Sequence, residues 1–314
     1  MSLHSVRLWV TEGCNASCHF CMNKNRRSNK TIDISKLERT YSYLRENEVN
    51  SVFLMGGEPT IHTDFVKIYT ISQLYFDKVI LFTNGLRTDV LTEIEPRVSD
   101  TIVYNANFVN DISTQVLLLE KEGLRIFDVV IDDLTDVISI ANGLRKIAEN
   151  DKRRLKFQIT INNSVNIFEK REIISKNINV LYGLLKNDYL DVSFECAAPI
   201  CFTYGLKLPI FKQRTICPNE SMLIDSEYNV CFCNVRNTPL VNLYQDGELV
   251  SFQIIKNYIH LCSYKNKTKC LEKICKDCIY YDLKCNGKCH IAQDCITVES
   301  IRDNTELPWL KRTR

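Results

Sequence analysis

The sequence predicts an α/β fold: a parallel β-sheet over its first two-thirds, followed by a small cysteine-rich α+β domain. Short apolar runs typical of buried strands alternate with helix-like segments up to about residue 205. Repeated strand–helix units of this kind join parallel strands by right-handed crossovers. Beyond about residue 206 the alternation stops and cysteines become frequent. We therefore expect two domains, 1–205 and 206–314.

The composition is that of a globular protein from a reducing compartment. The chain has 314 residues, 45% of them hydrophobic, which is enough for one large domain and a smaller one. Its net charge of +2 argues against a nucleic-acid partner. No apolar window reaches the roughly 18 residues of a membrane span, and no secretory signal precedes the first strand. Fifteen cysteines without an export signal indicate a cytoplasmic protein that binds metal and forms no disulfides.

Six strands are expected in the first domain, and one further segment is ambiguous. The segment 127–132 fits either a seventh strand or an inserted hairpin-like piece, and we favour six strands with an insertion. Helices are expected at about 35–48 and 64–76, from Asp89 onward, and over a long segment before residue 191. The expected strands are 6–10, 50–55, 78–82, 101–107, 155–162 and 191–195.

The first expected helix carries a start signal. Ser35 and Glu38 form the S-x-x-E pattern of a capping box. Leu37, Tyr41 and Leu44 follow at helical spacing. We therefore expect Ser35 to cap this helix and the three larger side chains to face the sheet.

Three cysteines in the loop after the first strand are the most informative feature. Cys14, Cys18 and Cys21 read C-x3-C-x2-C. Three thiolates this close can bind three irons of a [4Fe–4S] cluster and leave the fourth iron open for a ligand that is not protein. The alternative is a zinc or disulfide knot. Zinc needs a fourth protein ligand, and His19, adjacent to Cys18, is poorly placed to supply it.

A second motif follows the second expected strand. Gly56 and Gly57 lack a Cβ, so backbone here can approach a ligand closely. Glu58 offers a carboxylate to a cation, and Pro59 fixes the turn out of the strand. Taken alone, these four residues would predict only a turn.

Together the two motifs resemble the radical S-adenosylmethionine (SAM) superfamily, whose signature is C-x3-C-x-Φ-C with an aromatic Φ, here Phe20. The resemblance covers about residues 1–205 and implies a partial (β/α)6 TIM-like barrel. It also implies that the open iron binds the amino and carboxylate groups of SAM, and that the Gly-Gly-Glu-Pro turn contacts the α-amino group. In that family the reduced cluster cleaves SAM to a 5′-deoxyadenosyl radical, which abstracts a substrate hydrogen.

Asparagines and basic residues supply further candidates. Parallel α/β barrels place their chemistry at the carboxyl ends of the strands. Short amides there could bond ribose hydroxyls or the SAM carboxylate, although Asn is also a common turn former. The run Lys24, Arg26, Arg27 and Lys30 could meet an acidic substrate or the SAM carboxylate, and a solvated loop is the simpler interpretation. The asparagines at expected strand ends are Asn84, Asn105, Asn107, Asn162 and Asn163, with Asn84 and Asn162 ranked first.

The C-terminal cysteines have metal-ligand spacing, with C-x2-C-x6-C-x3-C from Cys275 to Cys289. A cysteine, a hairpin-like segment and further cysteines precede this core, a pattern that resembles the SPASM/twitch extension of radical SAM enzymes. Such extensions bind one or two auxiliary [4Fe–4S] clusters. By that resemblance, cluster I would use Cys217, Cys233 and Cys289, with Cys231 as a candidate fourth ligand, and cluster II would use Cys275, Cys278, Cys285 and Cys295.

Departures from the SPASM pattern keep alternatives open. Tyr228 stands where a hairpin glycine is usual, and Cys295 follows Cys289 unusually soon. A twitch-like domain with one cluster and a zinc ribbon both remain consistent with the spacing. Cys196 and Cys201, beside the last expected strand, are candidates to return a hydrogen atom to a substrate radical, although buried thiols are commonly inert.

The leading functional hypothesis is a radical SAM enzyme that modifies a ribosomally made peptide by cross-linking, epimerisation or oxidation. A radical SAM dehydrogenase or epimerase of a small metabolite is the runner-up, and a non-catalytic iron–sulfur electron carrier is the third reading. Expected partners are a peptide or small-molecule substrate and a reductant such as flavodoxin or ferredoxin. Because the first strand begins by residue 6, a separate leader-binding protein is a further expected partner. The sequence leaves the substrate, the bond formed, the fate of SAM and the oligomeric state open.

Overall fold

One sheet of ten strands organises the molecule. The computed structural model describes residues 3–21, 23–24, 27–113, 122–150, 156–162, 169–185, 191–194, 221–231 and 239–266. Within them the strand order is β10-β9-β8-β1-β2-β3-β4-β5-β6-β7. Strands β1 to β7 are all parallel to their neighbours. Their bounds are β1 Ser5–Thr11, β2 Ser51–Gly56, β3 Lys78–Thr83, β4 Thr101–Asn105, β5 Leu124–Ile131, β6 Lys156–Ile161 and β7 Asp191–Phe194.

The predicted α/β class with a parallel, barrel-like sheet is confirmed, and the strand count is corrected. Strand β5 pairs with β4 on one side and with β6 on the other, so it belongs to the sheet and is no insertion. Asp128 interrupts its apolar sequence and made it ambiguous. The carboxylate is tolerated because Thr160 and Gln158 on β6 donate hydrogen bonds to it.

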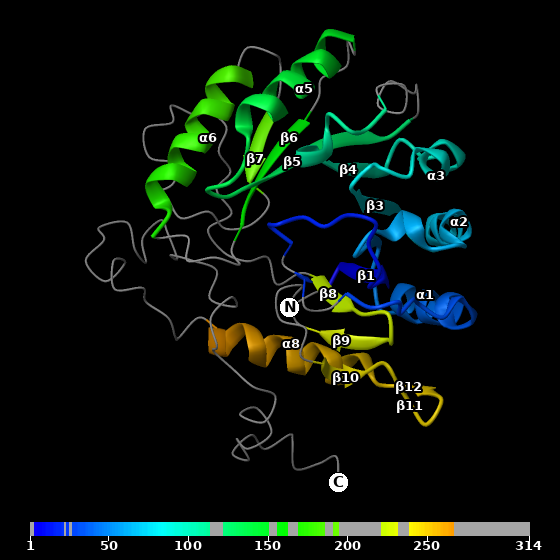
Figure 1. Ribbon diagram of the computed structural model, residues 1–314. Coiled ribbons are helices and arrows are strands. Elements are labelled where there is room, and N and C mark those ends of the chain that lie inside the picture. The colour runs from blue at the N-terminus through cyan, green and yellow to red at the C-terminus, as the bar shows by residue number, and fades with distance from the viewer. Residues whose placement is uncertain are drawn as a thin grey trace.

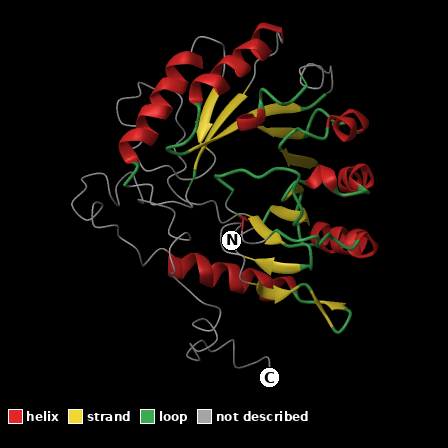
Figure 2. Cartoon of the chain, in the orientation of Figure 1, coloured by secondary structure: helices red, strands yellow, loops and turns green. Residues whose placement is uncertain are grey.

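The helices cover one face of the sheet. Val6, Leu8 and Val10 of β1 are fully buried in the same core cluster as residues from the helices. Strands form the inner layer and helices the outer layer of an open arc, with α1, α2 and α3 side by side (Figures 1 and 2). The helices on this face are α1 Leu37–Glu46, α2 Phe65–Tyr75, α3 Thr88–Glu93, α5 Val137–Asn150 and α6 Arg171–Leu185.

The start of α1 differs from the prediction. Its apolar stripe is confirmed, because Leu37, Tyr41 and Leu44 are fully buried. A short 3-10 turn, Ile34–Lys36, precedes the helix, and Asp33 caps this turn. The Asp33 carboxylate accepts hydrogen bonds from the Ser35 amide at 3.0 Å and the Ser35 hydroxyl at 2.6 Å. The expected capping box of Ser35 is therefore wrong, because Asp33 is the better acceptor two residues earlier.

Part of the cysteine-rich region extends this sheet. Strand β8 Ser221–Ile224 pairs parallel with β1, and β9 Asn229–Cys231 and β10 Pro239–Asn242 continue antiparallel. Tyr228, at the position where a glycine is usual, has a φ of 62°. That conformation suits glycine best, and the Tyr228 hydroxyl donates to the Asp33 carbonyl at 2.7 Å. The remaining described strands and helices are β11 Tyr244–Gln245, β12 Glu248–Leu249 and α8 Phe252–Asn266, with two short 3-10 turns at Pro59–Ile61 and Ala106–Phe108.

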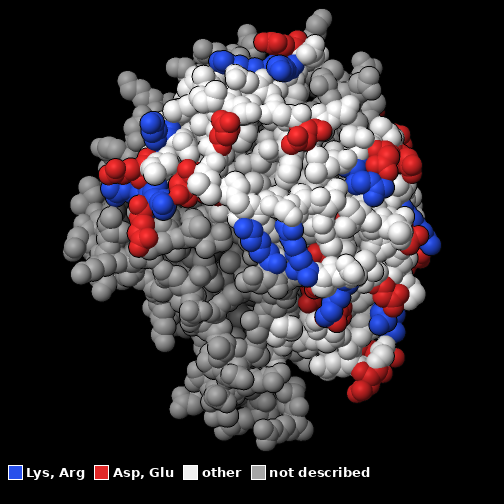
Figure 3. Space-filling model, in the orientation of Figure 1, with Lys and Arg blue, Asp and Glu red and all other residues white. Residues whose placement is uncertain are grey.

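Several predicted residues lie outside the described ranges. The domain boundary and the auxiliary clusters therefore stay predictions. On the face shown in Figure 3, basic and acidic side chains of the described residues are interspersed among neutral ones. None of the described helices combines the length and apolarity that a membrane span requires. The predicted residues outside the described ranges are Asn163, Cys196, Cys201, Cys217, Cys233, Cys275, Cys278, Cys285, Cys289 and Cys295.

Candidate cofactor site

A pocket at the carboxyl ends of the strands gathers most of those predicted site residues that the structure describes. It lies between the loop that follows β1, here called the cysteine loop (residues 12–30), and the ends of β2 to β5. This is the edge where parallel α/β barrels carry their chemistry. The predicted residues that line it are Cys14, Cys18, Phe20, Cys21, Gly56, Gly57, Glu58, Asn84 and Asn105.

The three thiols of the cysteine loop suit metal binding. All three are free and half-buried. Burial raises the pKa of Cys18 to about 11, with the neighbouring Cys14 and Cys21 adding to the effect, and burial also raises the pKa of Cys14. The raised pKa values favour the protonated thiols of Cys14 and Cys18, and a bound metal favours the thiolates that ligate it. In the part of the chain described, no three His, Cys, Asp or Glu side chains converge on one ion position. A [4Fe–4S] cluster presents a separate iron to each thiolate, so its three cysteines need not share one ion position.

Cys231, which was predicted as an auxiliary-cluster ligand, lies elsewhere. Cys231 on β9 is fully buried against Trp9 and Leu223. It is not among the residues that line the pocket. Its assignment to an auxiliary cluster stays a prediction.

Gly56 and Gly57 seat the cysteine loop on β2. The Gly57 amide donates to the Thr11 carbonyl and the Glu58 amide to the Gly13 carbonyl, both at 2.8 Å. A Cβ on Gly56 would clash with the Thr11 carbonyl oxygen, and one on Gly57 with the Gly13 carbonyl oxygen. Both glycines line the pocket as expected, but the backbone that approaches them is that of the loop itself.

Glu58 presents a buried carboxylate held by neutral donors. The residue is 1% exposed. Its Oε1 accepts from the Thr60 hydroxyl at 2.6 Å, the Thr60 amide at 3.2 Å and the Thr83 hydroxyl at 2.8 Å, and its Oε2 accepts from the Asn84 amide at 2.6 Å. Burial raises the pKa of Glu58, and these hydrogen bonds oppose the rise. Pro59 starts the 3-10 turn Pro59–Ile61 and does not line the pocket.

The structure separates the predicted asparagines into two groups. Asn84 lines the pocket and donates from Nδ2 to Asn15 Oδ1 of the cysteine loop at 2.8 Å. Asn105 also lines it and accepts from the Asn107 amide at 3.0 Å. Asn107 instead pairs with both backbone groups of Val130, at 2.9 and 3.0 Å. Asn162 donates to Asp132 at 3.2 Å. Asn107 and Asn162 therefore support strand ends and do not line the pocket.

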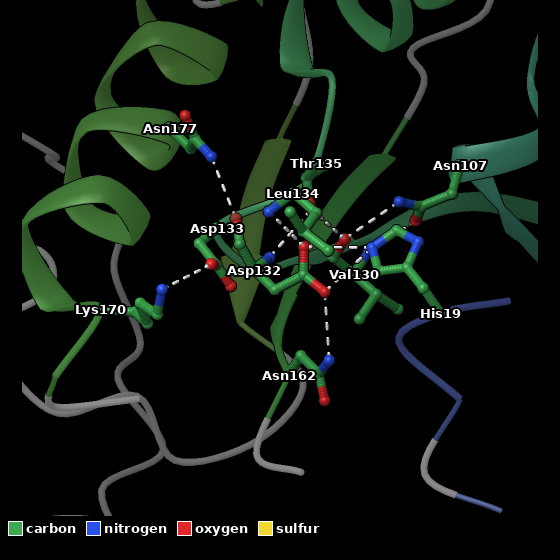
Figure 4. Close-up of polar contacts among 10 residues, drawn as sticks. All are labelled: His19, Asn107, Val130, Asp132, Asp133, Leu134, Thr135, Asn162, Lys170 and Asn177. Atoms are coloured by element: carbon green, nitrogen blue, oxygen red, sulfur yellow. Dashed lines mark hydrogen bonds and ion pairs between the residues drawn. The ribbon is translucent and has the colours of Figure 1, made fainter. Parts of the chain in front are cut away.

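His19 and Asp132 form a contact that the sequence analysis missed. His19 Nε2 lies 3.2 Å from Oδ1 and 3.1 Å from Oδ2 of Asp132, just beyond β5 (Figure 4). From its place beside Cys18, His19 suggested only a poorly placed zinc ligand. Residues more than a hundred positions apart gave no spacing signal that could connect them.

The charged residues lining the pocket are mostly acidic. Among described residues they are Glu12, Glu58, Asp128 and Arg27. Asp128 was missed because it sits inside an apolar strand, although its register opposite Asn105 turns it to the same side. Arg27 alone of the basic run's described members lines the pocket, and Lys30 pairs with Glu227 at 2.7 Å.

Comparisons with known proteins show which family and which relatives the chain resembles. Residues 9–117 match the family described as the Radical SAM superfamily. A GTP 3′,8-cyclase of Haemophilus ducreyi is 34% identical over 93 residues, which are 27% of this chain and 26% of that protein. A probable GTP 3′,8-cyclase of Saccharolobus solfataricus is 28% identical over 181 residues, 57% of this chain and 54% of that protein. The chain therefore spans about half, or less, of the length of these relatives.

Two crystal structures share the fold over most of the chain. Native anSMEcpe with bound AdoMet and the Cp18Cys peptide has a TM-score of 0.59 at 16% identity and covers 98% of this chain and 97% of its own. SuiB from Streptococcus suis bound to its precursor peptide SuiA has a TM-score of 0.57 at 13% identity, covering 96% and 74%. At these identities the likeness shows the fold alone. Residues 9–117 therefore match a radical SAM domain, and the fold shared with these two structures agrees with that match.

Proposed function

We propose that this chain binds a [4Fe–4S] cluster and SAM in the pocket and uses them to abstract a hydrogen atom from a peptide substrate. The observation that carries the proposal is the convergence of the cysteine loop and the Gly-Gly-Glu turn on one pocket. Each motif alone has simpler explanations. Their meeting at the carboxyl edge of a parallel sheet is the arrangement this chemistry needs.

The chain's own residues would bind and orient the cofactors. Cys14, Cys18 and Cys21 would ligate three irons. Glu58 has neutral donors on both oxygens, so its carboxylate suits the α-ammonium of SAM. Asn84 stands between Glu58 and the cysteine loop, within reach of the same nucleotide. When bound, the cluster supplies the one electron that breaks the sulfur–C5′ bond of SAM, giving methionine and the radical that takes the substrate hydrogen.

A peptide is the substrate class we favour. The fold is shared, over nearly its whole length, with a peptide-bound enzyme. The described charges that line the pocket are three carboxylates and one guanidinium, which suits a neutral or cationic segment better than a polyanion. An electron donor such as flavodoxin or ferredoxin and a separate leader-binding protein belong to the same proposal.

A nucleotide substrate is the second candidate, favoured by the relatives named GTP 3′,8-cyclase. A triphosphate would need cations, and Arg27 is the cation of the described lining. A dehydrogenation or epimerisation of a small metabolite would place a neutral molecule in the same space. Epimerisation and cyclisation can leave the mass unchanged, so the assay with each substrate should be read by chromatographic retention as well as by mass.

The initiation step can be tested without knowing the substrate. Anaerobically reconstituted protein, dithionite and SAM should yield 5′-deoxyadenosine, and Cys18→Ala should abolish it. Ser17→Ala, which removes a side chain of similar size from the same loop, is the matched control and should retain activity. Absence of product from the wild type would contradict the proposal and favour an electron carrier.

Auxiliary clusters form a separate part of the proposal. The C-terminal cysteines would bind two [4Fe–4S] clusters, giving about 12 Fe per chain with the SAM cluster. About 8 Fe would indicate one auxiliary cluster, and about 4 Fe with zinc would indicate a ribbon. Metal analysis of the reconstituted protein therefore separates these outcomes.

A further inference from the structure

The contact between His19 and Asp132 joins the cysteine loop to the carboxyl end of β5. His19 stands between Cys18 and Phe20, in the middle of the cysteine loop. Its partner Asp132 follows β5, which lies three strands along the sheet from β2. Figure 4 shows the contact between the two side chains. The His19 ring also packs edge-on against Phe20, with centroids 5.1 Å apart. Phe20 is 8% exposed and lines the pocket.

Asp132 is held in place by several hydrogen bonds besides its contact with His19. Its Oδ1 accepts from the Thr135 hydroxyl at 2.8 Å and the Leu134 amide at 3.0 Å, and its Oδ2 accepts from Asn162 at 3.2 Å. Its backbone carbonyl accepts from Asn177 of α6 at 3.0 Å. The side chain is 3% exposed, whereas that of His19 is 44% exposed. The carboxylate is therefore a rigid anchor, and the histidine is the element that docks on it.

The two ends of the cysteine loop are held differently. The residues that leave β1 are bound by the ends of β2 and β3, through Gly57, Glu58 and Asn84. The returning segment runs beside β1, where the Ile32 amide donates to the Val10 carbonyl at 2.9 Å. The His19 contact attaches the middle of the loop to the end of β5. In the sequence, His19 lies between Cys18 and Cys21.

We infer that Asp132 is a positioning residue that, through His19, holds the Cys18–Cys21 part of the cysteine loop over the pocket. The inference rests on the proposed function, because it assigns these cysteines to the SAM cluster. A loop held only at its two ends would let the cluster shift relative to the groups that bind SAM. A further anchor in the middle of the loop, on β5, restrains that shift, as outer contacts do for other metal sites.

The test compares His19→Ala with Asp133→Asn in reconstituted protein. Asp133 is the neighbouring carboxylate, and it pairs with Lys170 at 3.1 Å, away from the loop (Figure 4). We expect His19→Ala to bind SAM about tenfold more weakly, since a charge-assisted contact is lost. The change in the reduced cluster's electron paramagnetic resonance spectrum on adding SAM should also shrink. Asp133→Asn should match the wild type in both measurements.

Two further variants separate positioning from general damage. His19→Gln keeps a donor that can reach Asp132 and should recover part of the SAM affinity. Asp132→Asn should weaken SAM binding in the wild-type background and add little to His19→Ala, because both remove one contact. Because His19 is half-exposed, its variants should fold even if Asp132→Asn does not.

The outcomes keep this inference distinct from the proposed function. If wild-type protein binds a cluster whose spectrum SAM does not change, the proposed function is contradicted. If the wild-type spectrum responds to SAM and His19→Ala responds equally, the function stands and the positioning role is overturned. Equal losses in His19→Ala and Asp133→Asn would also overturn it, since they would indicate unspecific loosening of the region.

Discussion

The ends of β2 and β5 both hold a buried carboxylate against the cysteine loop, but the two carboxylates face opposite electrostatic conditions. At Glu58, burial dominates and raises the pKa, despite four neutral donor contacts. At Asp132, burial also acts to raise the pKa, but the bonds from Thr135, Asn162 and His19 outweigh it and the pKa is lowered. Hydrogen bonds within the protein therefore favour the ionised form of Asp132. The neutral donors around Glu58 do not offset the effect of its burial.

The largest effect should follow removal of the Glu58 charge. We expect Glu58→Gln to weaken SAM binding on the order of 100-fold, because the α-ammonium would lose its charged partner. Glu12→Gln is the control, since Glu12 is another acid of the pocket lining and contacts Ser28 of the loop. Equilibrium binding of SAM to reconstituted protein measures both. Equal effects of the two substitutions would show that Glu58 has no special part in binding.

The ends of β2 and β5 also differ in how they hold the cysteine loop. At β2 the contacts are backbone hydrogen bonds, and at β5 the contact is between two side chains. Gly57→Ala should lower the free energy of unfolding by about 1–3 kcal/mol, because its Cβ would meet the Gly13 carbonyl. Gly183→Ala in α6 is the matched control. No atom lies within 4 Å of its Cβ position, so helix propensity should raise stability by about 0.5–1 kcal/mol. Denaturant unfolding of the cluster-free protein checks the sign of each change.

This difference also explains what the sequence could predict. Each of the motifs after β1 and β2 is a short continuous run, so its resemblance to the radical SAM pattern could be recognised, and that resemblance implied that Cys14 and Glu58 share a site. The His19–Asp132 pair joins residues far apart in sequence, and only the register of β5 in the sheet brings them together. The same register was the least certain part of the predicted topology. The asparagines show the limit most directly, because identical residue types at strand ends line the pocket at Asn84 and pair with backbone at Asn107.

A pH series should sharpen the contrast between the two carboxylates. Asp132 has a lowered pKa when folded, so it stabilises the protein above the ordinary carboxyl pKa, and this contribution is lost as the pH falls through the folded value. The stability difference between wild type and Asp132→Asn should therefore shrink between about pH 6 and pH 3. For Glu58, whose pKa is raised, SAM affinity should increase as the pH rises through that pKa, because only the ionised form attracts the ammonium. A stability difference that grows on acidification would contradict the assignment for Asp132.

The smallest effect should come from the exposed contact between the cysteine loop and the β8–β9 turn. Lys30 and Glu227 pair at 2.7 Å, but both side chains are 52% exposed. The Glu227 carboxylate raises the pKa of Lys30, yet solvent and salt screen pairs of this kind. We therefore expect Lys30→Ala to leave both thermal stability and SAM affinity within experimental error of the wild type. A loss of SAM affinity similar to that of His19→Ala would mean that the β8–β9 turn, as well as β5, positions the cluster.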